Sequence, residues 1–180
     1  MRQITLISTG GTIEKTYDEH SGTLLNRSSI VQEMLGLLRL EETQVNTLQL
    51  MQKDSLDLTD ADRTRIVDAV RLLIGTAGTA IDEPGACAGV IILHGTDTLC
   101  DTGDWILRHI GHELRVPVIL TGAMRPFEMK RSDALQNLNE SIFAVGILDP
   151  GVYVVAHGRA LRFPGPVKAR ERGTFVMGRD

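Results

Sequence analysis

Hydroxyl-bearing residues and glycines crowd one short stretch near the start of the chain. Ser8, Thr9 and Thr12 surround the pair Gly10-Gly11. Two adjacent glycines let the backbone turn tightly and present its N–H groups at close range. A hydroxyl beside free N–H donors can attack a carbonyl and stabilise the oxyanion that forms. An ordinary strand-to-loop turn and a phosphate cradle are the alternatives that this stretch by itself leaves open.

Three more polar turns follow apolar runs further along the chain. They are Asp54-Ser55, Gly95-Thr96-Asp97 and Gly122-Ala123-Met124-Arg125. Thr96 and Asp97 would flank the substrate of a nucleophile at Thr12. A carboxylate at Asp97, close to a helix start, stays ionised easily and can bind a substrate ammonium group. Helix capping is the alternative for this pair, because Thr and Asp are both strong N-caps.

The elements that must position these turns alternate between strand and helix. Apolar, β-branched runs predict strands at residues 4–7, 45–50, 90–94, 117–120 and 152–156. Helical spacing of apolar residues predicts helices at about 30–38, 59–74, 98–110 and 133–145, the second one opened by a capping box at Thr59. The sequence therefore predicts an α/β fold: a largely parallel open sheet flanked by helices, in a Rossmann- or flavodoxin-like three-layer domain.

This architecture gives the four polar turns a common place. Ligands of an open parallel sheet bind beyond the carboxyl ends of its strands, and every one of the turns lies at such an end. Together the turns predict a site more strongly than any one of them alone.

The remaining segments carry weaker signals. Residues 15–23 are polar and predict a mobile loop, of the kind that acts as a lid beside a reactive turn. Residues 75–85 predict a loop of small residues. The pair Pro164-Gly165 predicts the turn of a two-stranded excursion over residues 161–168. The arginine-rich stretch from Arg170 to Arg179 is interpreted as a solvated end, with an interface as the alternative.

Length, charge and composition limit the function classes. The chain has 180 residues, of which 42% are hydrophobic and 23% charged, as is ordinary for one globular domain. A formal net charge of −4 gives no basic footprint for nucleic acid and no polybasic membrane signal. The first strand begins directly after Met1-Arg2-Gln3, and no apolar run approaches a membrane span, so we predict a cytoplasmic protein.

Cysteines and histidines add little chemistry. Cys87 and Cys100 stand in unlike contexts and are interpreted as reduced thiols. His109 and His112 with Glu113 form too weak a pattern to predict a metal site. His94 and His157 each end a strand near the predicted site, and we interpret them as structural residues rather than ligands. No metal and no cofactor are predicted.

Three motifs together resemble one known family. Thr9-Gly10-Gly11-Thr12-Ile13, His94-Gly95-Thr96-Asp97-Thr98 and Gly122-Ala123-Met124-Arg125-Pro126, in this order, are similar to the bacterial-type L-asparaginase/glutaminase family. The resemblance spans almost the whole chain but matches only the N-terminal α/β domain of that family. It therefore implies a short-chain asparaginase without the usual second domain.

The resemblance implies catalytic roles for five residues. Thr12 matches the nucleophile, which attacks the side-chain amide of L-asparagine, expels ammonia and forms a β-aspartyl ester that water hydrolyses. Tyr17 is the candidate for the activating tyrosine. Thr96 and Asp97 match the second conserved pair, which Lys168 completes. A solvated lysine and a plain loop aromatic are the alternatives for Lys168 and Tyr17.

The resemblance also implies how the substrate is held. Ser55 matches the serine that binds the α-carboxylate, Asp97 would take the α-ammonium group, and the carbonyl of Ala123 would meet the departing amide. Gly11 and Asp54 belong to the same predicted substrate-binding set. Leu56 replaces a glutamine of many longer relatives, so we expect glutamine to be a poor substrate.

Other functions stay open at this stage. A catalytically silent module that binds asparagine or aspartate is the main alternative, although intact Thr12 and Thr96 favour an enzyme. An amidotransferase component acting on aminoacyl-tRNA is a further alternative within the family, against which the acidic balance counts. As partners we predict L-asparagine and other copies of the chain in a homodimer or homotetramer, with no nucleic acid and no membrane.

Overall fold

The computed structural model describes residues 1–75 and 86–178 of the chain. Its strands are β1 (Arg2–Gly10), β2 (Thr16–Asp18), β3 (Thr23–Leu25), β4 (Thr43–Lys53), β5 (Cys87–Leu93), β6 (Pro117–Thr121), β7 (Gly151–Ala156), β8 (Arg159–Arg162), β9 (Pro166–Ala169) and β10 (Thr174–Met177). Its α-helices are α1 (Val31–Gly36), α2 (Asp60–Ile74), α3 (Leu99–Ile110) and α4 (Ala134–Val145). Short 3-10 turns η1 (Thr12–Glu14), η2 (Ser55–Asp57) and η3 (Arg170–Arg172) complete the order.

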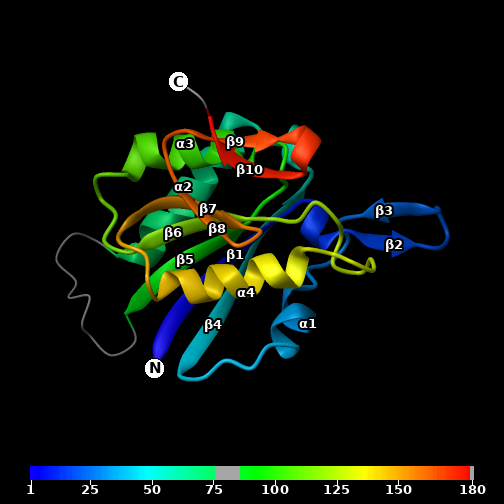
Figure 1. Cartoon of the computed structure of the whole chain (residues 1–180), viewed down its shortest axis with the longest axis horizontal. Coiled ribbons are helices and arrows are strands. Elements are labelled where there is room, and N and C mark those ends of the chain that lie inside the picture. Colours follow the sequence, from blue (N-terminus) through cyan, green and yellow to red (C-terminus); the bar gives the residue numbers. More distant parts are fainter. Residues whose placement is uncertain (76–85, 179–180) are drawn as a thin grey trace.

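Six strands form the central sheet in the order β4-β1-β5-β6-β7-β8. The first five run parallel, and β8 returns antiparallel to β7 at the edge. Helices α2 and α3 cover one face of this sheet, and α4 lies across the other (Figure 1). The predicted α/β fold with a largely parallel sheet is confirmed.

Alternating side chains of the central strands fill two separate cores, because successive residues of a strand point to opposite faces. The core on the α2/α3 side is built from residues such as Ile7, Ile92, Leu120, Val154, Ile66, Val70, Leu99 and Ile106. The core on the α4 side contains Leu6, Leu93, Ile119, Val155, Met34, Leu138 and Ile142. Strands buried on both faces explain the continuous apolar runs that predicted them.

The predicted capping box at the start of α2 is confirmed. The Thr59 hydroxyl accepts a hydrogen bond from Asp62 N–H at 3.3 Å, and the Asp62 carboxylate accepts one from Thr59 N–H at 3.0 Å. Lys53 Nζ, at the end of β4, lies 2.7 Å from the same carboxylate. This hydrogen bond, with those from Thr59, lowers the pKa of Asp62 to about 2 and so fixes α2 against the end of β4.

Three expectations about the irregular segments are wrong. Residues 15–23 do not form a plain loop, because β2 and β3 pair as an antiparallel hairpin. Residues 161–168 do not pair with each other: β8 pairs with β7, whereas β9 pairs with β10. The stretch from Arg170 is not a solvated end, because η3 and β10 fold it back along β9. Each segment has a pairing that local turn signals do not predict.

Some expectations concern other properties of the chain. The loop predicted at 75–85 lies almost wholly outside the described residues. Cys87 and Cys100 are free thiols, as predicted. Burial and the nearby Asp101 and Asp104 raise the pKa of the Cys100 thiol to about 12. Across residues 1–75 and 86–178, no helix combines the length and the apolar character needed to cross a membrane.

Candidate active site

The predicted nucleophile stands in a tight turn directly after β1. Thr12 is half-buried and opens η1, and Gly11 before it adopts φ 84°, which an L side chain rarely takes. Gly11 N–H donates to the Lys53 carbonyl at the end of β4, at 3.0 Å. The turn is thereby held between two neighbouring strands of the sheet.

Two glycines allow the strand-end turns to pack against one another. A Cβ on Gly11 would lie 2.4 Å from the Gly95 nitrogen, and a Cβ on Gly95 would lie 2.6 Å from Ser55 Oγ. No side chain fits at such a separation, so both positions require glycine. The turns after β1, β4 and β5 are therefore in direct contact, and they bring Thr12, Ser55 and Thr96 to one edge of the sheet.

Lys168 reaches this edge from β9. Its Nζ donates to Thr96 Oγ1 at 2.7 Å and to Asp97 Oδ1 at 3.0 Å. The alternative of a solvated lysine does not hold, because the side chain is only 17% exposed. Helix capping does not explain Thr96 and Asp97 either, since Thr98 is the N-cap of α3. The predicted grouping of Thr96, Asp97 and Lys168 is present in the structure.

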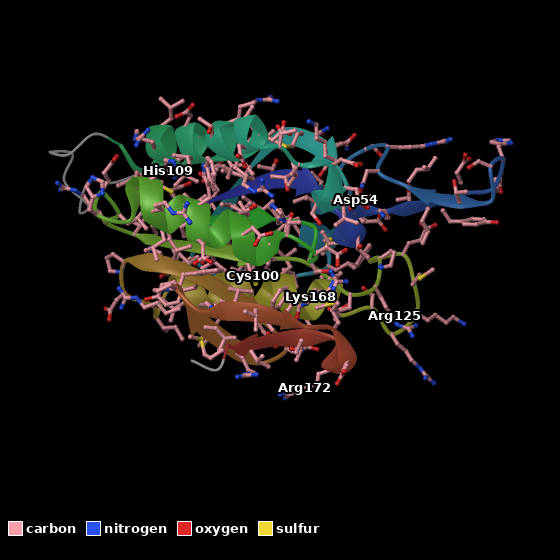
Figure 2. All side chains as sticks on the ribbon, turned by 90° about the horizontal axis from the view of Figure 1, so that it is seen from above. Asp54, Cys100, His109, Arg125, Lys168 and Arg172 are labelled. Atoms are coloured by element: carbon pink, nitrogen blue, oxygen red, sulfur yellow. The ribbon has the colours of Figure 1, made fainter. Side chains whose placement is uncertain are left out.

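Arg170 is a fourth member of this group that the sequence did not suggest. Its guanidinium lies 2.9 Å from Asp97 Oδ1, the oxygen that also accepts from Lys168. Two cations thus face one carboxylate at the mouth of the turns. Asp54, Lys168 and Arg125 gather at the carboxyl end of the sheet, with His109 toward the opposite end (Figure 2).

Ser55 and Asp54 lie side by side in sequence but are placed differently. Ser55 is 1% exposed, and its Oγ finds no hydrogen-bond partner within the described residues. A buried hydroxyl without a partner is costly, and a ligand oxygen would relieve that cost. Asp54 is already engaged: it accepts from Leu56 N–H at 3.2 Å and from Lys15 Nζ at 2.8 Å. The hydrogen bond from Lys15 lowers the pKa of its carboxyl.

The turn after β6 carries Ala123, which is 1% exposed. Gly122 before it accepts a hydrogen bond on its carbonyl from Asn137 Nδ2, at 2.8 Å. Further along the same loop, Phe127 N–H donates to the carbonyl of Ile13 at 3.3 Å. This second bond ties the loop to the nucleophile turn, so Ala123 belongs to the same cluster of turns as Thr12.

Tyr17 lies on the hairpin formed by β2 and β3, which projects from the body of the molecule (Figures 1 and 2). The residue is 58% exposed. Its backbone N–H donates to Glu128 Oε2 at 2.6 Å, so the base of the hairpin is attached to the loop after β6. The structure thus leaves the phenol in solvent, on an element anchored next to the cluster of turns.

Glu14 is a buried carboxyl directly behind the nucleophile turn, which the sequence did not single out. Its Oε1 accepts from Ser29 Oγ at 2.6 Å, and its Oε2 accepts from Ser8 Oγ and from Gly10 N–H, the latter at 3.3 Å. Burial raises the pKa of Glu14 above its ordinary value, although these hydrogen bonds oppose the shift.

His94 is structural, as interpreted from the sequence. It is fully buried, its Nδ1 donates to the Gly95 carbonyl at 2.8 Å, and its Nε2 accepts from Thr102 Oγ1 at 2.9 Å. Burial lowers the pKa of the imidazole to about 4, and the charge of Arg63 adds to the effect against the opposing Gly95 bond. The neutral ring orients the turn that carries Thr96.

Comparison with known proteins places this site in a family. The family model described as "Asparaginase, N-terminal" matches residues 3–172. The chain belongs to the asparaginase family. This confirms the resemblance that the three motifs carry.

Individual relatives point to two activities within the family. The L-asparaginase of Thermococcus kodakarensis is 29% identical over 152 residues, which are 84% of this chain and 43% of the relative. A component protein of the glutamyl-tRNA(Gln) amidotransferase of Thermoplasma acidophilum is 30% identical over 145 residues, 81% of this chain and 33% of the relative. The solved structure of the thermostable L-asparaginase from Thermococcus kodakarensis superposes with a TM-score of 0.77 at 27% identity.

The extent of these matches is itself informative. The superposed structure covers 97% of this chain but only 51% of the other chain. This chain thus spans about a third to a half of the relatives it matches. The prediction that it works without the second domain of the family stays a prediction.

Proposed function

We propose that the protein is an L-asparagine amidohydrolase, which releases L-aspartate and ammonia. The observation that carries the proposal is the contact of Lys168 Nζ with both Thr96 and Asp97, beside the Gly11–Thr12 turn. A cation bonded to a buried hydroxyl and a carboxylate, next to a second hydroxyl in a turn of free N–H groups, suits acyl transfer better than passive binding.

In the proposed reaction, Thr12 Oγ1 attacks the side-chain amide carbon of asparagine. A new C–O bond forms, the carbonyl oxygen takes the negative charge, and backbone N–H groups of the strand-end turns stabilise it. The C–N bond then breaks, the nitrogen leaves as ammonia with the hydroxyl proton, and a β-aspartyl ester remains. Water hydrolyses this ester, releasing aspartate and restoring the Thr12 hydroxyl.

Two groups would assist the proton transfers. Lys168 holds its positive charge 2.7 Å from Thr96 Oγ1, where it favours negative charge developing nearby. Tyr17 is the proposed activating phenol, and it must move from solvent toward the turns to act, since it is 58% exposed. The short hairpin that carries Tyr17 is suited to such a closing motion.

The two charged ends of the amino acid would be held separately. The unpartnered hydroxyl of Ser55 would donate to the α-carboxylate, and Asp97 would accept from the α-ammonium group. The Ala123 carbonyl would accept from the departing amide. The proposal extends to weak turnover of glutamine, a cytoplasmic setting, and a homodimer or homotetramer.

A second candidate function rests on the match to the glutamyl-tRNA(Gln) amidotransferase component. In that case the same threonine chemistry would supply ammonia to a partner protein instead of serving amino-acid breakdown. The two candidates share the site and differ in whether the chain alone turns over free asparagine.

The deciding experiment compares ammonia release from L-asparagine and L-glutamine by the unmodified protein and by Thr12→Ala. We expect release from asparagine, at least about ten-fold less from glutamine, and loss of both in Thr12→Ala, since removal of a nucleophile leaves only the residual catalysis of the site. Thermal unfolding of both proteins checks that folding is equal.

Each other result has its own meaning. Binding of asparagine in calorimetry without any ammonia release would replace the enzyme by a binding module. Release only when glutamyl-tRNA and a partner protein are supplied would favour the amidotransferase role. Equal turnover of both amides would contradict the expected effect of Leu56.

A further inference from the structure

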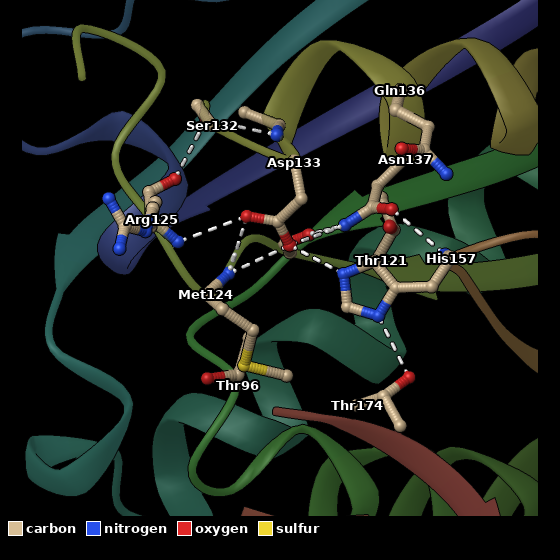
Figure 3. A network of polar contacts seen from close by, with 12 residues as sticks. Thr96, Thr121, Met124, Arg125, Ser132, Asp133, Gln136, Asn137, His157 and Thr174 are labelled. Atoms are coloured by element: carbon tan, nitrogen blue, oxygen red, sulfur yellow. Dashed lines mark hydrogen bonds and ion pairs between the residues drawn. The ribbon is translucent and has the colours of Figure 1, made fainter. Parts of the chain in front are cut away.

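A second polar cluster lies behind the loop that carries Ala123, and it centres on the carboxylate of Asp133 (Figure 3). Asp133 accepts from Met124 N–H at 2.9 Å and from Arg125 N–H at 3.0 Å. It also accepts from Asn137 Nδ2 at 3.0 Å, and the same amide nitrogen holds the Gly122 carbonyl. The backbone is therefore fixed on both sides of Ala123.

His157 joins this cluster to another part of the chain. Its Nε2 lies 2.8 Å from Asp133 Oδ2, and its Nδ1 lies 2.8 Å from Thr174 Oγ1 on β10. Burial opposes ionisation of Asp133, but the hydrogen bonds from Met124 N–H and His157 outweigh it and hold the pKa of the carboxyl below its usual value. An ionised Asp133 only accepts, so Nε2 donates to it, and in the neutral ring Nδ1 accepts from Thr174.

Thr174 stands next to the lysine of the site in the β9–β10 ladder. It pairs with Ala169, and the following residue, Phe175, pairs with Lys168. A side chain that fixes Thr174 therefore fixes the strand from which Lys168 reaches Thr96 and Asp97. His157 thus bridges the loop of Ala123 and the hairpin of Lys168, which lie 45 positions apart in sequence.

The backbone of His157 shows that the turn alone does not explain this residue. His157 and Gly158 form the two-residue turn between β7 and β8, with φ of 54° and 74°. Positive φ at both positions marks the type I′ turn, for which Asn-Gly is the preferred sequence. A histidine at the first position is less suited to the turn, and strained residues persist where surrounding contacts determine them.

We propose that His157 is a positioning residue that couples the Ala123 carbonyl to Lys168, through Asp133 on one side and Thr174 on the other. This inference rests on the proposed amidohydrolase function, because it concerns the alignment of two groups assigned to the reacting amide. His157 touches neither group itself. It keeps the loop that receives the departing amide in register with the lysine that acts on the same reaction.

The turn supplies a variant that separates positioning from folding. His157→Asn replaces the histidine by the residue that the type I′ turn prefers, so the turn is retained or improved. The shorter side chain cannot reach Asp133 and Thr174 together. Thr174→Val removes the hydroxyl and keeps a β-branched residue in β10. His112→Asn is the matched control, because its side chain is 78% exposed and lies outside the cluster.

The experiment measures amide hydrogen exchange and the kinetics of ammonia release in the four proteins and in the double variant His157→Asn/Thr174→Val. For His157→Asn we expect an unchanged or higher Tm and about ten-fold faster exchange at both Met124–Arg125 and residues 166–177. We expect kcat to fall about ten-fold with KM nearly constant, because groups proposed to act on the reacting amide move while the anchors of the α-carboxylate and the α-ammonium stay.

The double variant tests the coupling itself. Loss of Thr174 should add little once His157 is gone, since both changes break one chain of contacts. Additive losses, faster exchange in only one of the two segments, or faster exchange with unchanged kcat would each overturn the proposal. If the unmodified protein releases no ammonia, the amidohydrolase function fails, whereas the exchange measurement still decides whether His157 links the two segments.

Discussion

The two sides of the candidate site are built in opposite ways. On the lysine side, Lys168 is 17% exposed and bonded to Thr96 and Asp97, and its hairpin is tied to the body through β10. On the tyrosine side, Tyr17 is 58% exposed on a hairpin with strands of three residues each. One half of the site is assembled before any substrate arrives, and the other half is not.

The difference follows from what each side packs against. The turns after β1, β4 and β5 touch one another and rest on two apolar cores, so little freedom remains there. The β2–β3 hairpin meets the body through polar contacts such as that of Tyr17 N–H with Glu128. Few buried apolar contacts are the mark of segments that open locally. We therefore expect changes on the tyrosine side to alter catalysis alone, and changes on the lysine side to alter catalysis and stability together.

The largest expected effect comes from Tyr17→Phe. Loss of the phenolic hydroxyl should lower kcat for asparagine by about 10²- to 10⁴-fold, as loss of a general acid or base does. Thermal unfolding should not change, because the ring is mostly in solvent. Ammonia release and Tm together check the prediction, with Thr16→Ser on the same strand as a control. An unaltered kcat would remove Tyr17 from the mechanism and leave activation to the lysine side.

Lys168→Met should have the next largest effect, and a different character. The methionine keeps most of the side-chain volume but removes the charge and both hydrogen bonds, so kcat should fall about 10²-fold. The free energy of unfolding should also fall, by about 1 kcal/mol, because Thr96 is buried and loses its partner. Urea unfolding measures this loss. A fully stable Lys168→Met protein would contradict the contrast between the two sides.

The smallest effect concerns Glu14, which lies between the two sides. Because burial raises its pKa in the folded state, the folded protein binds this proton more tightly than the unfolded chain. The stability that it contributes is present below the unfolded pKa and declines as the pH rises through the folded pKa. Relative to Glu14→Gln, the unmodified protein should therefore lose stability with rising pH. Urea midpoints of both proteins across about pH 4 to 8 test the sign, and parallel curves would contradict it.

The lysine side can be predicted from the sequence far better than the tyrosine side. Strands such as β5 and β6 carry continuous apolar runs, and the rule for parallel sheets places Thr96 and Ala123 at one edge. The β2–β3 hairpin carries no such run, since its strands are short and mostly outside the cores, and its polar composition predicts a loop instead. Burial on both faces leaves a strong local pattern, whereas a projecting hairpin leaves almost none.

Contacts between loops are the part that the sequence does not reveal. Arg170 meets Asp97, and His157 meets Asp133, across 73 and 24 positions, with no periodic signal at either end. One signal is present: His157-Gly158 between two β-rich runs is consistent with a two-residue hairpin. That pattern predicts the pairing of β8 with β7 and excludes the two-stranded excursion over residues 161–168.

The position of β1 inside the sheet has a consequence for the order of folding. β1 is made first on the ribosome, yet its two neighbours, β4 and β5, end only at Lys53 and Leu93. Closing such long loops costs entropy before any strand pairing repays it. The turn that carries Thr12 therefore stays without its packing partners until half of the chain has been synthesised, and a nascent chain shorter than this carries the reactive residue but no reaction centre.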